Sequence, residues 1–168
     1  MTDIIVHAIH PSDISAVMEI QSGSKEAAQW PQEAYEKLLQ ASTSELGWVA
    51  ERDGCIIGFV VVRQVADELE ILNLAVAAIA RRHGAGKALL QHILCHVSTQ
   101  GVRKVFLEVR ASNLIAQRFY SVLGFTIAGR RASYYTSPAE DALLLSRSLP
   151  ELSGKINRDP VLASRPKL

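Results

Sequence analysis

Short runs rich in β-branched and apolar residues divide the chain into segments that are typical of strands. These runs cover residues 4–10, 47–52, 55–65, 68–76, 104–110, 125–135 and 141–149. The dipeptide Asp53-Gly54 separates the second run from the third, and such a pair is a strong signal for a tight β-hairpin. We therefore expect an antiparallel meander of three consecutive strands in this part of the chain.

Four other segments place apolar residues three and four positions apart, which is the spacing of an amphipathic helix. They cover residues 11–22, 31–40, 84–98 and 113–124. Asn113 suits the cap before the last of these helices, and Gly124 suits the residue that ends it. The element order is then β-α-α-β-β-β-α-β-α-β-β, which predicts an α/β fold with one mixed sheet and helices on its faces.

The chain has 168 residues and a formal charge of +1, which favours one domain and argues against a nucleic-acid binder. We expect a single domain over residues 1–149 and a mobile tail over residues 150–168. We expect neither a signal peptide nor a membrane span, because the first residues lack a positive region before an apolar run and no apolar run approaches the length that spans a bilayer. Cys55 and Cys95 form no C-x-x-C pair and are expected to be buried thiols, so a cytoplasmic protein away from the membrane is expected.

A loop with two glycines precedes the third predicted helix and invites comparison with nucleotide-binding motifs. A Walker A loop needs a glycine where the chain has Arg81 and a hydroxyl where it has Ala88. A dinucleotide-binding loop needs a third glycine where the chain has Leu89. The remaining pattern, R-x-x-G-x-G after a strand, offers consecutive backbone N–H groups at a helix start, which can hold a pyrophosphate without a metal ion.

Two separated motifs resemble the GNAT N-acetyltransferases. The first is NLAVAAIARRHGAGKALL at residues 73–90, and the second is LEVRASNLIAQRFYSVLGF at residues 107–125. The second motif is similar to the pattern of the bacterial ribosomal-protein-alanine N-acetyltransferases, and the resemblance extends over residues 69–149. It implies the GNAT fold with splayed central strands, and an enzyme that moves an acetyl group from acetyl-CoA to a primary amine with no metal ion.

The resemblance also implies where acetyl-CoA is held. Its pyrophosphate is expected on the backbone of Arg82, His83, Gly84, Ala85, Gly86 and Lys87. The backbone of Leu74, Ala75 and Val76 is expected to pair with the pantetheine arm, and an N–H group near Val76 to stabilise the oxyanion. Asn113 contacts the cofactor in the family, and a helix cap is its alternative or additional role.

Glu108 is the candidate general base. It alternates with the apolar residues of its strand and so points away from their face. A carboxylate there can collect the proton of an α-amino group, directly or through water. From the residues alone, a solvated glutamate paired with Arg110 or Lys87 is the alternative, and the family motif favours the base.

Tyr120 is the candidate acid for the leaving thiolate. The expected apolar stripe of its helix is Ile115, Phe119 and either Val122 or Leu123. That stripe leaves Tyr120 on the flank of the helix, where a phenol can reach a groove. A packing aromatic is the alternative, and the resemblance favours the catalytic role.

The acceptor site is expected to be lined by Trp30, Asn73, Tyr134 and Tyr135. The resemblance implies a protein N-terminus as acceptor, namely the alanine of a ribosomal protein. The chain departs from the family pattern in QWPQEAY at residues 29–35, where Trp and Pro are exchanged, and in RRASYY at residues 130–135, which is one residue longer. A small-molecule amine, a polyamine or a lysine side chain is therefore the alternative acceptor, and a non-catalytic acyl-CoA-binding module is a further alternative.

Two other patterns carry no chemistry in this interpretation. His92 and His96 lie four residues apart on a predicted helix, but the glutamate of the H-E-x-x-H zinc motif is missing. A solvated helix face is expected there. No G-x-S-x-G elbow is present, so acyl hydrolysis by a serine nucleophile has no support. The oligomeric state is not set by the sequence.

Overall fold

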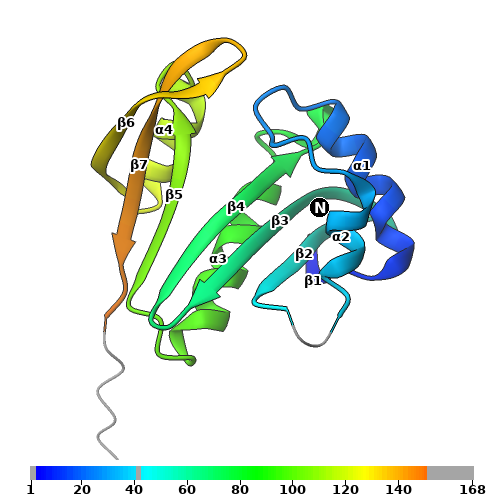
Figure 1. The fold of residues 1–168 in the computed structure, drawn as a ribbon. Coiled ribbons are helices and arrows are strands. Elements are labelled where there is room, and N and C mark those ends of the chain that lie inside the picture. Colours follow the sequence, from blue (N-terminus) through cyan, green and yellow to red (C-terminus); the bar gives the residue numbers. More distant parts are fainter. Residues whose placement is uncertain (1–2, 41–42, 151–168) are drawn as a thin grey trace, which may run out of the picture.

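The computed structural model describes residues 3–40 and 43–150, and these form one seven-stranded mixed sheet with helices on both faces (Figure 1). The strands are β1 (Ile5–Ala8), β2 (Glu45–Arg52), β3 (Cys55–Val65), β4 (Glu68–Val76), β5 (Lys104–Arg110), β6 (Thr126–Thr136) and β7 (Ala139–Ser148). The helices are α1 (Ile14–Ser22), α2 (Gln32–Lys37), α3 (Ala85–Ser98) and α4 (Leu114–Val122), with short 3-10 turns at Pro11–Asp13 and Ala78–Ala80. The predicted order of elements is confirmed.

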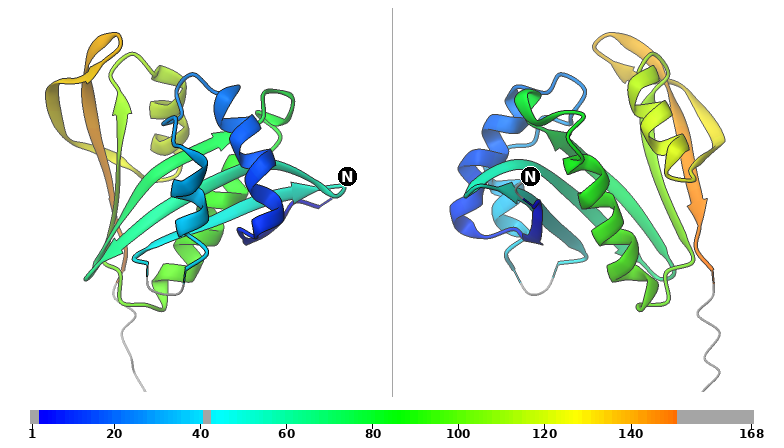
Figure 2. Two further views of the ribbon diagram at one scale, coloured as in Figure 1. Left: turned by 45° about the vertical axis from the view of Figure 1, so that its right-hand side comes forward. Right: turned by 180° about the vertical axis from the view of Figure 1, so that it is seen from behind.

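The strand order in the sheet is β1-β2-β3-β4-β5-β7-β6. Every neighbouring pair is antiparallel except β4 and β5, which are parallel and are joined by the crossover through α3. Helices α1 and α2 cover one face of the sheet, and α3 and α4 cover the other (Figure 2). We call these the α1–α2 face and the α3–α4 face.

Each face of the sheet has its own apolar core. Leu89, Leu90 and Ile93 of α3 are fully buried in one cluster, and Val17 and Tyr35 of α1 and α2 are fully buried in the other. The central strand β3 is buried on both faces, with six consecutive buried residues. This two-sided burial explains why the sequence of β3 is an almost unbroken apolar run.

Two predicted turns have the expected geometry. Asp53 and Gly54 both have positive φ angles, 54° and 76°, which is the conformation of a type I′ hairpin turn. Gly124 has φ of 84°, and the N–H groups of Gly124 and Phe125 donate to the carbonyls of Ser121 and Tyr120. This pair of bonds is the Schellman motif expected at the end of α4.

The two cysteines differ from expectation, because both are exposed free thiols. Cys55 begins β3 directly after the hairpin turn, and Cys95 lies on the outer side of α3. The predicted tail, apart from Pro150, lies outside the described residues. No helix in the described part of the chain is long and apolar enough to cross a membrane.

Candidate active site

The sheet opens between β4 and β5 (Figure 1). The two strands pair through Glu68–Ile71 of β4 and Lys104–Leu107 of β5. Beyond these four pairs β4 continues to Val76 and β5 continues to Arg110 without pairing to each other. The predicted splay of the central strands is therefore present, and the unpaired ends of both strands border it.

A β-bulge in β4 coincides with the start of the opening. Val62 of β3 pairs with Ile71 and Val61 pairs with Asn73, so Leu72 has no partner on β3. An extra residue reverses the alternation of side chains along a strand. Ile71 packs in the core under α3, whereas Leu72 and Asn73 both contact the α1–α2 side.

The backbone of β4 presents polar groups to the opening. The N–H of Ala77 donates to the carbonyl of Ile57 on β3 at 2.9 Å, so by alternation the backbone of Ala75 also faces β3, while Leu74 and Val76 face the opening. Arg81 Nε donates to the Val76 carbonyl at 3.2 Å. Three residues are predicted to pair with the pantetheine arm of acetyl-CoA. Leu74 and Val76 have backbone groups directed into the opening, and Ala75 does not.

The loop before α3 has the shape of an anion-binding turn. Arg82 and Gly84 have positive φ angles, 63° and 91°. Among the described residues, no acceptor bonds the backbone N–H of any residue from 82 to 87. Helix starts leave such N–H groups free, and the helix dipole adds positive potential at the same place. The predicted pyrophosphate loop therefore offers a row of free donors.

The two glycines of the loop have different structural reasons. Gly84 adopts a left-handed conformation that disfavours other residues. Gly86 has ordinary helical geometry, but a methyl group there would lie 3.3 Å from the ring of Phe119 on α4. Gly86 therefore lets α3 and α4 approach each other beside the opening.

Glu108 lies on the α1–α2 face at the unpaired end of β5. Its side chain is 13% exposed, and Oε1 accepts from Arg131 Nε of β6 at 2.9 Å. Tyr134 also hydrogen-bonds Glu108, and this bond to a carboxylate, more than partial burial, raises the pKa of Tyr134. The partners considered from the sequence were wrong: Arg110 pairs with Glu140, and no pair joins Lys87 to Glu108 among the described residues.

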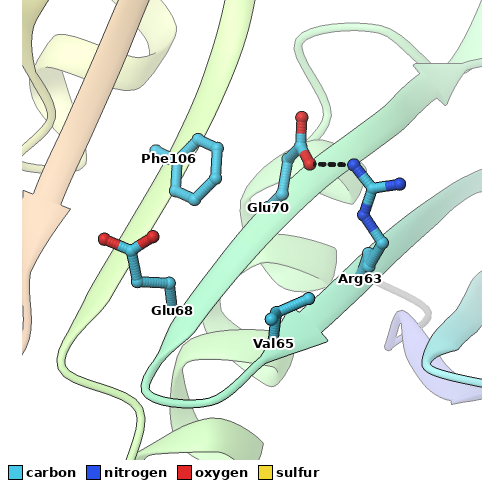
Figure 3. A pocket seen from close by; sticks show the side chains of 5 residues that line it. All are labelled: Arg63, Val65, Glu68, Glu70 and Phe106. Carbon is cyan, nitrogen blue, oxygen red and sulfur yellow. Dashed lines mark hydrogen bonds and ion pairs between the residues drawn. The ribbon is translucent and has the colours of Figure 1, made fainter.

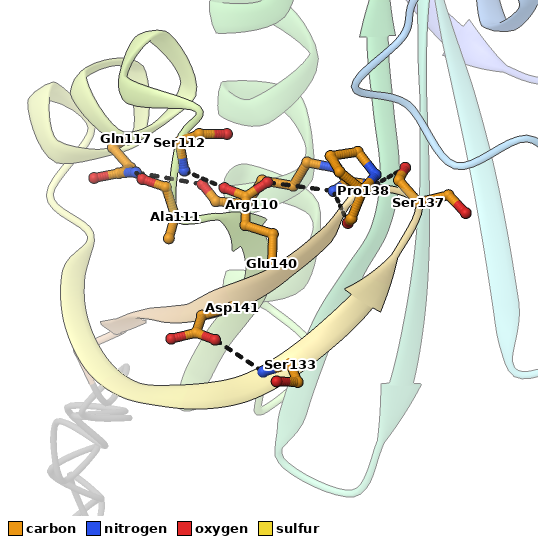
Figure 4. Close-up of polar contacts among 9 residues, drawn as sticks. All are labelled: Arg110, Ala111, Ser112, Gln117, Ser133, Ser137, Pro138, Glu140 and Asp141. Carbon is orange, nitrogen blue, oxygen red and sulfur yellow. Dashed lines mark hydrogen bonds and ion pairs between the residues drawn. The ribbon is translucent and has the colours of Figure 1, made fainter.

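A polar network around Arg110 joins the end of β5 to the hairpin of β6 and β7 (Figure 4). Arg110 donates to Glu140 at 3.3 Å and to the carbonyls of Ser137 and Pro138. The same guanidinium lies 4.1 Å from the centroid of the Tyr135 ring. These contacts join the end of β5 to the hairpin and fix the position of Tyr135. The roles of Tyr134 and Tyr135 in binding the acceptor stay a prediction.

Tyr120 is deeper than the predicted stripe of α4 allows. It is 6% exposed, whereas Ile115 and Val122 are 85% and 87% exposed. The expected stripe was wrong at Ile115 and Val122, which are exposed, whereas Phe119 and Leu123 do pack against the core. Tyr120 joins them on the face toward the sheet. Burial raises the pKa of the Tyr120 phenol, and its hydroxyl has no hydrogen-bond partner among residues 3–40 and 43–150. The ring packs against Phe119 and Phe125.

Three other predicted site residues have defined structural roles. Asn113 caps α4, since its side chain accepts from the N–H of Ala116 at 3.0 Å. Asn73 is buried, and its amide bonds Ala28 and Tyr35 rather than pointing into open space. Trp30 exchanges backbone bonds with the side chain of Gln21, which fixes the α1–α2 loop that carries it.

Known proteins resemble this chain in both sequence and fold. The acetyltransferase (GNAT) family model matches residues 14–125. The chain belongs to the GNAT acetyltransferase family. It is 32% identical over 145 residues to [ribosomal protein bS18]-alanine N-acetyltransferase of Escherichia coli, covering 84% of this chain and 95% of that protein. A putative enzyme of the same name from Bacillus subtilis is 31% identical over 144 residues, covering 86% and 95%.

The crystal structure of the ribosomal-protein-S18-alanine N-acetyltransferase from Escherichia coli superposes with a TM-score of 0.80 at 28% identity, covering 92% of this chain and 99% of that one. The protein is thus an acetyl-CoA-dependent N-acetyltransferase. The free N–H row before α3 suits the pyrophosphate of acetyl-CoA, and the Leu74 and Val76 edge suits the amides of its pantetheine arm. The residues present therefore fit this GNAT co-substrate.

Arg131 is the ion-pair partner of Glu108 that the sequence did not reveal. Its partner Glu108 lies on another strand, so no local pattern links the two. The one signal was the extra residue in RRASYY, and β6 indeed loses its register with β7 between Arg131 and Tyr135. The irregular segment between Arg131 and Tyr135 lies beside Glu108, since Arg131 and Tyr134 both contact its carboxylate.

A shallow pocket on the α1–α2 face is lined by Arg63, Val65, Glu68, Glu70 and Phe106 (Figure 3). It sits over the paired part of β4 and β5, below the opening, and its charges are taken up in pairs such as Arg63 with Glu70 at 2.5 Å.

The histidines of α3 differ from expectation. His92 and His96 are half-buried, and both rings pack on Trp48 of β2 instead of lying on a solvated face. A separate cluster of His7, His10 and Asp13 has side-chain ligand atoms within 4.8 Å of one another. It adjoins β1 at the far edge of the sheet from β5, so it is no part of the opening.

Proposed function

We propose that this acetyltransferase modifies the N-terminal α-amino group of a protein, with Glu108 as general base and Tyr120 as general acid. The observation that carries the proposal is the position of Glu108 at the end of β5. Its carboxylate lies on the α1–α2 face, whereas the free N–H row and Tyr120 belong to the α3–α4 side. Donor and acceptor can therefore enter the opening from opposite faces of the sheet.

Each residue has one step in this proposal. Bound acetyl-CoA supplies the acetyl group as a thioester. Glu108 accepts a proton from the amine nitrogen as that nitrogen bonds the acetyl carbon, directly or through water. The Val76 N–H donates to the carbonyl oxygen as negative charge develops on it. Tyr120 then donates its proton to the departing sulfur, and its raised pKa keeps the phenol protonated up to that point.

The choice of acceptor rests on the relatives and on the hairpin. The two sequence relatives are named for the alanine N-terminus of ribosomal protein bS18. Tyr134 and Tyr135 lie beside Glu108. The loop between α1 and α2, which carries Trp30, lies across the opening from the β6–β7 hairpin (Figure 1). An extended peptide with its terminal nitrogen at Glu108 would pass between these two walls.

The test measures release of CoA thiol from acetyl-CoA with an alanine-initiated peptide, the same peptide with a blocked N-terminus, and a panel of small amines. Mass spectrometry locates the added acetyl group. We expect acetylation of the free N-terminus, and a loss of about 10² to 10⁴ in kcat/KM for Glu108→Gln. Glu70→Gln is the matched control, since Glu70 is also ion-paired on the same face. Acetylation of small amines without the peptide would instead establish a small-molecule acceptor.

A further inference from the structure

The carboxylate of Glu108 is paired before any acceptor arrives. Arg131 Nε lies 2.9 Å from Glu108 Oε1, and no other cation among the described residues forms a pair with Glu108. The arginine side chain is 59% exposed, whereas the glutamate is 13% exposed. The positive charge therefore lies on the solvent side of the carboxylate, where an acceptor amine must approach.

The irregular segment of β6 holds Arg131 in this place. Pairing with β7 stops at Arg131 and resumes at Tyr135, so residues 132–134 bulge away from the ladder. Asp141 of β7 anchors the bulge, because its Oδ1 accepts from the Ser133 N–H at 2.8 Å. Its other oxygen, Oδ2, pairs with the exposed Arg130 outside the bulge at 2.6 Å. Arg130 and Arg131 thus have separate carboxylate partners, and the guanidinium of Arg131 is directed to Glu108.

Tyrosines complete the surroundings of this pair. The Tyr134 ring lies 5.5 Å from the Arg131 guanidinium, and Tyr134 hydrogen-bonds Glu108. Burial and then the negative charge of Glu108 raise the pKa of Tyr135. The nearest cation on the same strand, Arg110, is bound to Glu140. Arg131 is therefore the one charged side chain of β6 that compensates Glu108.

We propose that Arg131 is a specificity-determining residue that disfavours ammonium acceptors and so selects α-amino groups over lysine side chains. The inference rests on the proposed role of Glu108. An α-amino group has a pKa of about 8 and a lysine side chain about 10.4, so at pH 7.5 roughly a quarter of the first and about one thousandth of the second are neutral. An uncompensated carboxylate attracts both ammonium ions, and the paired carboxylate attracts them much less.

A neutral amine has a free lone pair, so it can react beside the Glu108 carboxylate while Arg131 is paired with that carboxylate. When its nitrogen bonds the acetyl carbon, one N–H proton passes to Glu108 and the C–S electron pair leaves with the sulfur. The guanidinium takes no part in bond making. It affects only whether the ammonium form or the neutral form of the acceptor binds beside Glu108.

The test compares Arg131→Gln with Arg130→Gln, a control on the same strand with the same charge and a different partner. The quantity measured is kcat/KM at one pH for primary amines and peptides whose amine pKa values run from about 8 to about 10.4. We expect Arg131→Gln to lower the preference for α-amines over lysine by about two- to fivefold, the effect of one partly exposed ion pair. Arg130→Gln should keep the wild-type preference, and Arg131→Lys should restore it.

A binding measurement separates selection from catalysis. With CoA in place of acetyl-CoA, calorimetry at pH 6 follows binding of an alanine-initiated peptide in its ammonium form. Arg131→Gln should bind it several-fold more tightly than the wild type and the Arg130→Gln control. An unchanged preference, or an equal loss toward all amines, would overturn the inference. If the wild type acetylates small amines and not the peptide, the protein acceptor is wrong, and the preference among those amines still decides the role of Arg131.

Discussion

Replacing Asn73 by alanine should detach the α1–α2 loop from the bulge of β4. The Asn73 amide makes three hydrogen bonds, with the N–H of Ala28 at 3.2 Å, with the carbonyl of Ala28 at 2.9 Å and with the Tyr35 hydroxyl at 3.2 Å. A hydrogen bond contributes about 0.5 to 1.5 kcal/mol net. Ala28 is exposed, so water can replace its two bonds, and the total loss should be about 2 to 3 kcal/mol.

Chemical and thermal unfolding of the purified protein measure this loss. For a domain of this size each kcal/mol lowers the midpoint by about 2 to 4 °C, so Asn73→Ala should unfold about 4 to 12 °C earlier. Steady-state kinetics should show a higher KM for the acceptor and an unchanged KM for acetyl-CoA, because the loop that moves carries Trp30 and the free N–H row does not move with it.

Tyr35→Phe is the matched variant. It removes the hydroxyl, but Gln21 Oε1 keeps the Trp30 N–H and Asn73 Nδ2 keeps the Ala28 carbonyl. The cost should be about 1 kcal/mol, smaller than that of Asn73→Ala. An Asn73→Ala protein with wild-type stability and a raised acceptor KM would refute the reasoning, because Asn73 would then touch the acceptor, as predicted from the sequence, rather than hold the loop.

Three further predictions use other features of the molecule. Tyr120→Phe should lower kcat by about 10² or more and leave the unfolding midpoint nearly unchanged, because the hydroxyl bonds no described residue; a large loss of stability would contradict this. Gly84→Ala, at φ of 91°, should cost about 1 to 2 kcal/mol and raise the KM for acetyl-CoA rather than for the acceptor. Burial raises the pKa of Tyr35 to about 12, above about 10 in the unfolded chain, so Tyr35 should contribute a fall of about 2 to 3 kcal/mol in the free energy of unfolding as the pH rises from 10 to 12. Tyr35→Phe should remove this share and leave the share of Tyr120, whose pKa burial also raises.

Local chemistry was sufficient to predict the turns, caps and element order. The Asp53-Gly54 hairpin, the Asn113 cap and the Gly124 stop each depend on residues within one turn of the chain, and all three have the expected geometry. Helix lengths were less accurate. The helix expected over residues 31–40 spans Gln32–Lys37, and the one expected over residues 11–22 begins as a 3-10 turn.

The buried face of α4 could not be chosen from its sequence. Its apolar residues lie on more than one side, so Ile115, Phe119 and Val122 form as good a stripe as Phe119 and Tyr120. The sheet and Phe125 select the second stripe, and this selection is tertiary. The bulge at Leu72 is likewise invisible locally, although it decides that Asn73 faces α1 and α2 rather than α3.

The parts of the candidate site that lie within a contiguous motif could be predicted from the sequence. The parts that depend on contacts between residues far apart in the sequence were missed. The loop at residues 82–87 and the strand end at Glu108 were found from two contiguous motifs. The pairing of Glu108 with Arg131 joins two strands separated by a helix, and its cause is a loss of register that sequence alone does not specify.

The edge of β4 along the opening has a consequence for how this enzyme can change over generations. The groups directed into the opening at Leu74 and Val76 are main-chain amides, while the side chains of the same residues pack toward α3. Replacement of either side chain alters packing but leaves the row of amides in register with the strand. In the proposed binding mode, docking of the donor is thus shielded from mutation, whereas acceptor choice, which we assign to side chains of β6, is free to diverge one residue at a time.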